Sequence, residues 1–480
     1  MSAVAQPVVL SAGDVYEQRK ISFVVDRLVR TLSLSGGCVS CFERPGEVAV
    51  IALIVFLFLA HVIGIAVVDR RITNGQIIAG DGLFYYEYLP SLILDGDLNF
   101  TNQRNAARQL NVPYDWSGDW VFKKTKTGLL GNPLAPGWAL LTSPFFVVGH
   151  ALSSGLSAAG VPVRLDGYGI IDQFFTNLGA VIYGLFGIYL CYRALREFFD
   201  DTTSAVAVVA FVLCSNLPYY IVVIASMSHA VSFFCMAWST FAFIKISKGE
   251  GSFSQFGCAA GLALLSRPQL LPVIGLFFLT LAWLRAQDFG RLVGSGAVCA
   301  AIAALQLLVW KILFGSFLLV PQGDGFLQPL APHMLGVLFA LRHGFITWTP
   351  FVAVAIAGLV FGAIASNRRL IYFMFLLAFA SQVYINSIAL DWWGGNSFGY
   401  RRLIEVYPLL MFGLALLMSL SWKSRVTLAT MAVFFAVFNA LFFVQYRFCY
   451  IPRGEAITFQ QLLADKLHLY RLDRSYCQMG

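Results

Sequence analysis

The sequence predicts an all-α polytopic membrane protein, with about eleven transmembrane helices and interfacial helices in a large first external loop. Of its 480 residues, 58% are hydrophobic and only 12% are charged, and the mean hydropathy is +0.73. A water-soluble domain could not expose that much apolar surface. Apolar runs such as 48–68 reach the roughly 20 residues that a helix needs to cross the hydrocarbon core of a bilayer.

About eleven apolar windows are predicted to be membrane spans, and one further window is not. The stretch from Trp138 to Leu152 covers only about 15 residues and opens with Pro133 and Pro136, so we expect a re-entrant or interfacial helix there. The predicted spans lie near 47–68, 170–191, 203–223, 229–246, 254–266, 269–284, 292–313, 347–364, 370–388, 403–421 and 426–446.

Basic residues set the predicted orientation. They gather in the N-terminal segment and in alternate short loops, namely 192–196, 245–248, 285–291, 368–369 and 423–425, and such loops stay in the cytoplasm. The predicted organisation is a cytoplasmic segment 1–46, a transmembrane domain 47–446 with external loops 69–169 and 314–346, and an external tail 447–480. Short loops and the lack of a retention signal favour a bacterial inner membrane.

The remaining composition argues against other classes of protein. The net charge of +8 is spread over the loops, so the sequence lacks the clustered basic residues that are typical of nucleic-acid binding. The nine cysteines lie mostly inside predicted spans and predict no disulfide framework.

The sharpest candidate for chemistry is Asp81, in a Gly-Asp-Gly sequence shortly after the first predicted span. Tyr85 and Tyr88 follow at spacings of four and three, which places them on the same face of a helix as Asp81. A carboxylate among aromatic side chains could accept a proton from an incoming hydroxyl group. Asp before a helix is also the typical N-cap residue, and spacing alone favours that alternative.

Two neighbouring cations, Arg401 and Arg402, stand at the predicted external end of a span, where the positive-inside rule disfavours them. A lipid phosphate would explain them, because Arg forms bidentate, charge-assisted hydrogen bonds with phosphate and stabilises the charge of a phosphate leaving group. The alternatives are ion pairs with Asp391 or Glu405, or contacts with lipid head groups.

Other polar and aromatic residues lie near the same predicted face. Arg267 precedes a proline between two short spans, where a charge needs a partner, and His229 is either a phosphate contact or a core or capping histidine. The full set of candidate phosphate ligands is Arg267, Arg342, His343, Arg401, Arg402 and His229, and the candidate pocket-lining residues are Tyr85, Tyr86, Trp392 and Trp393.

The predicted architecture resembles the GT-C superfamily of integral membrane glycosyltransferases. It has one transmembrane helix, then a large external loop that opens with an acidic residue, then many further helices. That superfamily includes protein O-mannosyltransferases, lipid A aminoarabinose transferases and the oligosaccharyltransferase catalytic subunit. The family's acidic residue falls on Asp81; this chain has Gly-Asp-Gly where relatives often have a second acidic neighbour. The resemblance implies a GT-C-like fold over most of 47–446 and a polyprenyl-phosphate-linked sugar as donor.

The predicted function is therefore inverting transfer of a sugar to a hydroxyl acceptor at the external face, with Asp81 as general base. The acceptor would be a lipid-linked glycan, a polysaccharide or a protein. Alternatives are a ligase or polymerase that uses a polyprenyl diphosphate glycan, and a transporter without chemistry. No cofactor is predicted with certainty; a divalent cation stays open, because Asp81, Glu87, Asp95, Asp97, Asp115 and Asp119 supply oxygen atoms but match no known metal-binding loop.

Overall fold

The computed structural model describes residues 44–65 and 76–466, except 113, 115, 117 and 119. Most of the predicted cytoplasmic segment, the end of the tail, and Asp115 and Asp119 lie outside the described residues. The described part is helical and contains no β-strand beyond two isolated bridges, which confirms the all-α prediction.

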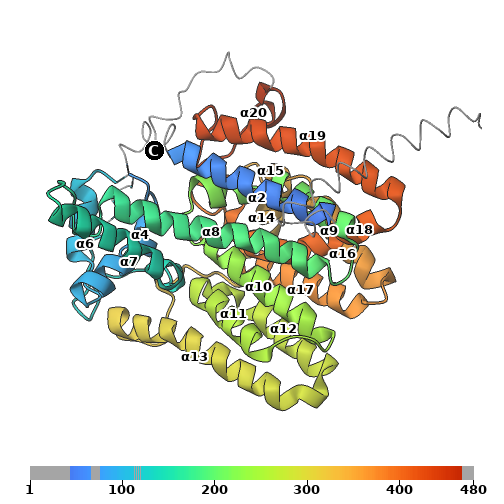
Figure 1. The fold of residues 1–480 in the computed structure, drawn as a ribbon, viewed down its shortest axis with the longest axis horizontal. Helices are drawn as coiled ribbons and strands as arrows, with labels where there is room; N and C mark the ends of the chain where they lie inside the picture. Colours follow the sequence, from blue (N-terminus) through green and yellow to red (C-terminus); the bar gives the residue numbers. More distant parts are fainter. Residues whose placement is uncertain are drawn as a thin grey trace, which may run out of the picture.

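The helices fall into a bundle and a set of shorter elements at its loops (Figure 1). The bundle consists of α2 (Pro45–Ile63), α8 (Ile170–Leu195), α9 (Asp201–Leu213), α10 (His229–Ser247), α11 (Phe253–Ser266), α12 (Leu271–Leu284), α13 (Phe289–Phe314), α16 (Val352–Ala365), α17 (Arg369–Ser387), α18 (Tyr407–Ser419) and α19 (Trp422–Arg447). The other elements are α4 (Gly82–Tyr86), α5 (Tyr88–Pro90), η3 (Ser91–Asp95), α6 (Thr101–Gln109), α7 (Gly137–Ala158), η4 (Tyr219–Val223), η5 (Pro268–Leu270), η6 (Ala286–Asp288), α14 (Met334–Phe339), α15 (Phe345–Trp348), η7 (Arg401–Val406) and α20 (Phe459–Leu463).

Eight helices of the described part are long and apolar enough to cross a membrane, and four apolar helical segments of 10–17 residues accompany them. The shorter segments are α9, α11, the continuous η5 and α12, and α16. The predicted count of eleven spans is thus not confirmed, although each predicted window overlaps one of these helices. The difference arises because four predicted windows form helices of fewer than 18 residues, while α7, which was not a predicted span, is one of the eight long helices.

Helix α7 is longer than the sequence predicted. It runs for 22 residues, continues through Pro144, and is one of the eight long apolar helices. The apolar window seemed to end at Leu152 because serines follow, but Ser153 is buried and its hydroxyl donates to Asp172 on α8 at 3.4 Å. The predicted length of about 15 residues was therefore wrong, while an interfacial position for α7 stays a prediction.

The predicted cytoplasmic loops meet at one end of the bundle. Lys245 and Lys248, at the end of α10, lie 3.5 and 2.5 Å from carboxylate oxygens of Glu197. Arg425 pairs with Asp200 at 3.3 Å in the same region. The opposite end of α10 begins at His229, and its 19 residues separate the two ends by about 28 Å.

The helices of the first long loop, α4, α6 and α7, gather at one end of the molecule (Figure 1). The N-terminus of α7 contacts the end of α11, because a Cβ on Gly137 would lie 2.5 Å from the backbone nitrogen of Ser266. The indole of Trp138 donates to the carbonyl of Ala225 at 3.1 Å, just before α10. The loop helices therefore pack on the end of the bundle that is opposite the basic loops.

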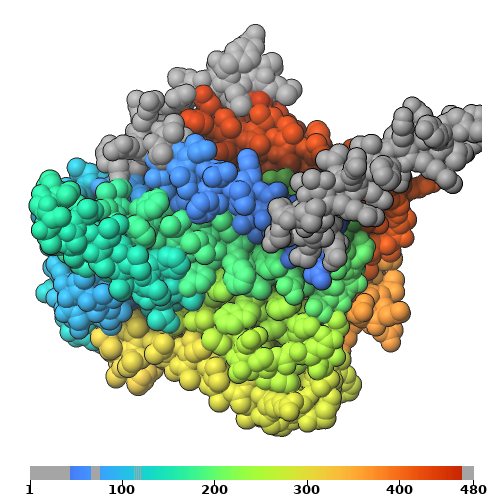
Figure 2. All heavy atoms as spheres, in the orientation of Figure 1, coloured from blue at the N-terminus to red at the C-terminus, as the bar shows by residue number. Residues whose placement is uncertain are grey.

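Burial differs sharply between the helices. In α10 and in the segment formed by η7 and α18, 78% of the residues in an apolar stretch of 18 are buried. In α19 the corresponding share is 11%. Figure 2 shows α2 and α19 on the surface of the molecule, where their apolar side chains would face lipid. The most deeply buried long helices are thus α10, which begins at His229, and the continuous η7 and α18, which begin at Arg401.

Candidate active site

Asp81 sits at the start of α4 between two glycines that shape the local backbone. Gly80 has a φ of +57°, a left-handed conformation that costs glycine little. A Cβ on Gly82 would collide with the Ser226 side chain. The Gly-Asp-Gly sequence therefore serves a tight turn and a close approach of α4 to Ser226, and any side chain at position 82 would have to displace Ser226.

The Asp81 side chain does not cap α4. Asp81 occupies the N-cap position, but it has helical backbone angles and makes no side-chain capping hydrogen bond. Its Oδ2 accepts a hydrogen bond from Arg401 Nη2 at 2.9 Å. Asp81 therefore stands at the N-cap position without acting as a side-chain cap, and its carboxylate is 40% exposed beside its partner.

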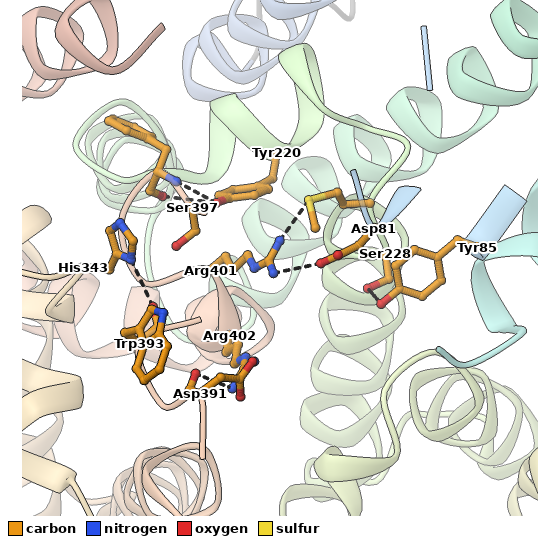
Figure 3. A network of polar contacts seen from close by, with 12 residues as sticks. Asp81, Tyr85, Tyr220, Ser228, His343, Asp391, Trp393, Ser397, Arg401 and Arg402 are labelled. Carbon is orange, nitrogen blue, oxygen red and sulfur yellow. Dashed lines mark hydrogen bonds and ion pairs between the residues drawn. The ribbon is translucent and has the colours of Figure 1, made fainter. Parts of the chain in front are cut away.

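Arg401 is the first residue of η7 and supplies the cation of this pair (Figure 3). Its side chain is only 12% exposed, and its Nη1 lies 3.2 Å from the sulfur of Met227. The preceding loop turns through Gly394, Gly395 and Gly399, all with positive φ. Neither Asp391 nor Glu405 is the partner of Arg401; a mostly buried cation instead faces a partly exposed carboxylate.

Arg402 points elsewhere. Its Nη2 lies 2.5 Å from Asp391 Oδ2, which is one of the pairings that the sequence left open. The charge of Arg402 is thus already balanced within the loop, while the partner of Arg401 comes from the other half of the chain.

Arg267 and His229 share a buried carboxylate, Glu405. Arg267 Nε lies 3.4 Å from Glu405 Oε1, and His229 Nδ1 lies 3.0 Å from the same oxygen. The hydroxyl of Ser232 donates to it at 2.8 Å. Glu405 is almost fully buried, so it supplies the partner that a charge such as Arg267 needs at this depth.

A chain of hydrogen bonds connects this carboxylate back to α4. Arg267 Nη1 donates to Ser228 Oγ at 3.1 Å, and Ser228 Oγ donates to the Tyr85 hydroxyl at 3.0 Å. Asp81 directly precedes α4 and Tyr85 lies within it, and Arg401 and Glu405 both belong to η7. Two routes therefore join α4 to η7, and we call the six residues Asp81, Tyr85, Ser228, Arg267, Glu405 and Arg401 the polar ring.

His343 and Trp393 lie on the side of Arg401 away from Asp81 (Figure 3), and Arg342 joins them through the Trp393 ring. The Arg342 guanidinium lies over the Trp393 ring, 3.9 Å from its centroid, and Arg342 Nε donates to the carbonyl of Gly454 at 2.7 Å. His343 Nδ1 lies 3.1 Å from the carbonyl oxygen of Trp393. These contacts anchor the loop that carries Arg401.

Burial lowers the pKa of His343 to about 4, and Arg401 and Arg342 nearby act in the same direction. At neutral pH this imidazole is therefore uncharged. It can offer a hydrogen bond to a ligand but no positive charge.

In each of the two predicted pocket-lining pairs, Tyr85 with Tyr86 and Trp392 with Trp393, the two side chains point to different places. Tyr85 contacts the polar ring through Ser228, whereas the Tyr86 hydroxyl donates to the carbonyl of Gly167 on the other side of α4. Trp393 lies beside Arg342, while the Trp392 ring stacks on His333 with centroids 5.3 Å apart. Tyr85 and Trp393 are thus near Arg401, and Tyr86 and Trp392 support the surrounding loops.

A buried ion pair in the first loop was not predicted. Glu87 receives two hydrogen bonds from Arg104, at 2.9 and 2.7 Å, and one from the Asn132 amide at 2.9 Å. Both charged side chains are fully buried. The sequence did contain a signal for this ion pair. Glu87 lies within a run of aromatic residues, where burying a carboxylate without a partner would be costly.

The acidic residues of this loop act mainly in turns and pairs. Asp97 Oδ1 accepts hydrogen bonds from Ser91 and from the Asn99 amide, both at 3.0 Å, and Asp95 accepts one from Asn102 at 2.8 Å. Within the described ranges, no three His, Cys, Asp or Glu side chains converge as a metal site would require.

No protein-family model matches this sequence, and no curated protein matches it. Among solved structures, the chain is similar to ArnT from Cupriavidus metallidurans, both apo and bound to undecaprenyl phosphate. The identity is 15% and the TM-score 0.49, over 88% of this chain and 73% of ArnT.

It is also similar to the Archaeoglobus fulgidus oligosaccharyltransferase, with 13% identity and a TM-score of 0.46, over 86% of this chain and 57% of that protein. Both belong to the GT-C superfamily, which is the superfamily that the sequence resembles. At such identities the similarity concerns the arrangement of helices alone, so the activity has to follow from the site itself.

Proposed function

We propose that this chain is a membrane glycosyltransferase that moves a sugar from a polyprenyl-phosphate-linked donor to a hydroxyl acceptor. The observation that carries the proposal is the pair formed by an accessible carboxylate, Asp81, and a mostly buried cation, Arg401. Acid–base chemistry at a hydroxyl and recognition of a leaving phosphate need these two groups side by side.

The donor phosphate would compete with Asp81 for Arg401. A phosphate oxygen carries more negative charge than one carboxylate oxygen and can accept both Nη hydrogen bonds of the guanidinium. Nη1 now faces only the sulfur of Met227, a weak acceptor. Donor binding would thus release Asp81 from its ion pair and leave it free to accept a proton.

In the proposed reaction, the acceptor hydroxyl gives its proton to the Asp81 carboxylate as its oxygen attacks the anomeric carbon. The bond from that carbon to the phosphate oxygen breaks, and polyprenyl phosphate leaves with the electron pair, stabilised by Arg401. Attack from the face opposite the leaving group inverts the anomeric configuration.

The proposed location is a bacterial inner membrane with the N-terminus in the cytoplasm and the site on the external face. The site lies at the start of α10, and the basic loops gather at the end of the same helix; basic loops are typical of the cytoplasmic side. Cys449, just beyond α19, is disulfide-bonded, whereas the five cysteines of the bundle are free. Disulfides are typical of oxidising compartments outside the cytoplasm.

A ligase or polymerase that uses a polyprenyl diphosphate is a second candidate. The observation in its favour is that two cations, Arg342 and Arg401, both lower the pKa of His343, so the loop beside the site carries a second positive charge. The transporter alternative rests on Arg267 and Pro268 alone, and the charge of Arg267 is balanced by Glu405.

The decisive experiment measures transfer of radiolabelled sugar from a panel of polyprenyl monophosphate and diphosphate sugars. Membranes would contain wild type, Asp81→Asn or, as a matched control, Asp97→Asn at equal expression. Transfer from a monophosphate that falls about 100-fold or more in Asp81→Asn, with Asp97→Asn active, would support the proposal. Transfer from diphosphates alone would favour the ligase, and transfer that is unchanged in Asp81→Asn would refute the role of Asp81.

A further inference from the structure

The chain between α13 and α15 is almost free of charge and exposes many apolar side chains. We call its residues 317–339, which include α14, the apolar loop. Between Lys311 and Arg342 the sequence contains one charged residue, Asp324. The most exposed apolar side chains of the loop, at 75% or more, are those of Leu318, Leu330 and Leu335. Apolar patches of this kind normally contact a membrane or another protein rather than water.

The apolar loop is fastened to the end of α17 by backbone hydrogen bonds. The amide nitrogen of Gln328 donates to the carbonyl of Ile388 at 2.7 Å, and that of His333 donates to the carbonyl of Ser387 at 2.9 Å. Helix α17 is one of the long apolar helices, and its 19 residues span about 28 Å, close to the thickness of the hydrocarbon core. The loop therefore lies at the level where α17 would leave the bilayer.

Helix α14 is apolar on both of its faces. Val337 on the inner face is fully buried, and a Cβ on Gly336 would lie 2.8 Å from the Trp392 ring. On the outer face, Leu335 and Phe339 are exposed, and their spacing of four places them side by side. A helix that is apolar all round belongs in a protein core or in lipid, so the outer face of α14 needs an apolar cover.

The exposed apolar surface of the loop continues that of α13. Leu305, Leu308 and Ile312 are exposed and form one stripe by their spacing of three and four. Only 22% of the apolar stretch of α13 is buried, so this stripe would face lipid. Beyond it, Lys311 Nζ lies 5.3 Å from the centroid of the Phe317 ring, as a cationic side chain does when it snorkels at a membrane interface.

We infer that the apolar loop inserts its outer side chains, Leu318, Leu330, Leu335 and Phe339, into the external leaflet of the bilayer. Lipid acyl chains are the occupant that fits best, because the patch extends a lipid-facing helix at the level of the bilayer surface. A docking site for a soluble protein would have a polar rim, and this stretch has a single charge. The inference goes beyond the proposed function, since it concerns which surface meets lipid and not the reaction.

The experiment places a fluorescent non-natural amino acid at one position of the full-length protein at a time, in phosphatidylcholine vesicles. The test positions are Leu330 and Leu335. Leu308 on α13 is the control for a position in lipid, and Gln109, which is exposed on α6, is the control for a position in water. Phosphatidylcholine that is brominated on its acyl chains quenches from within the bilayer, and iodide on both sides of the vesicles quenches from water.

We expect brominated lipid to quench both test positions at least half as strongly as Leu308. Iodide should quench them several-fold less than Gln109, because hydrocarbon excludes ions. Iodide quenching equal to that at Gln109 at either test position would place the loop in water and overturn the inference. Protection from both quenchers would show that protein covers the loop, which would overturn it equally. Neither result would bear on sugar transfer, since no donor is present.

Discussion

Asp81 and Arg401 are separated by 320 positions in the sequence, and their side chains meet at 2.9 Å between Oδ2 and Nη2. Asp81 comes from the first long loop, and Arg401 begins the segment that leads into α18. The carboxylate is partly exposed and the guanidinium mostly buried, so a ligand can reach the pair from one side only. Each prediction below tests one part of the arrangement that holds these residues together.

Arg401 and its neighbour Arg402 should differ in their effect on transfer. Arg401→Gln removes the cation beside Asp81, and we expect kcat to fall about 100- to 1,000-fold, as for other groups that stabilise a leaving charge. Arg402→Gln should cost less than about 10-fold, because Arg402 is already paired with Asp391. Initial rates over a range of donor concentrations would check this. Equal losses in the two variants would show that the Asp81 contact does not single out Arg401.

Gly82 should be intolerant of a side chain. Gly82→Ala places a Cβ against Ser226, so α4 must shift and carry Asp81 away from Arg401. We expect transfer to fall by at least about 10-fold, since small displacements of positioned groups are costly. The double variant Gly82→Ala/Ser226→Gly should recover much of the activity. Failure of this rescue, with Ser226→Gly itself active, would contradict the steric explanation.

Glu405 should be essential for stability. Glu405→Gln leaves Arg267 without its buried counter-charge, and breaking a buried ion pair from one side costs about 3–5 kcal/mol. Thermal unfolding in detergent should show a clearly lowered Tm. Glu250→Gln is the matched control, because Glu250 pairs with Lys245 at an exposed position, where water screens the two charges and the pair contributes little to stability. Similar Tm values for both variants would argue against the polar ring as a stabilising element.

His343 should make stability depend on pH. Burial lowers its pKa to about 4 in the folded state, against about 6.5 when unfolded. Between these values the unfolded chain binds more protons than the folded protein. The contribution of the uncharged His343 to the free energy of unfolding is therefore fully present above pH 6.5 and is lost as the pH falls toward 4. The loss should be on the order of 2–3 kcal/mol. Tm measured from pH 7.5 to 4.5 should fall more steeply for wild type than for His343→Gln; parallel curves would contradict the assignment.

Much of the architecture follows from local sequence patterns. The apolar windows predicted the bundle helices, because hydropathy is a property of consecutive residues. Helix α7 was underestimated, since the burial of Ser153 against Asp172 depends on a neighbouring helix. Asp81 could also be recognised as a candidate site residue from the sequence, because a lone carboxylate between two glycines follows soon after the first predicted span.

The pairings within the site could not be predicted in the same way. Glu405 was considered as a partner of Arg401, four residues away, yet it pairs with Arg267 and His229 on other elements. Which charges meet is decided by how η7 packs against α10, and that is a tertiary property. Tyr86 is different, because its spacing of five from Asp81 already indicated the opposite face of α4.

The polar ring also constrains the order in which the protein can mature during synthesis. Helices α10 and α11 leave the ribosome well before η7, so the nascent chain carries Arg267 and His229 at a membrane boundary before Glu405 has been translated. Until the last two bundle helices are inserted, this half of the molecule holds an uncompensated charge. A product truncated before residue 390 would therefore retain most of its spans and still display an unpaired arginine, a feature by which cellular quality control could distinguish it from the finished enzyme.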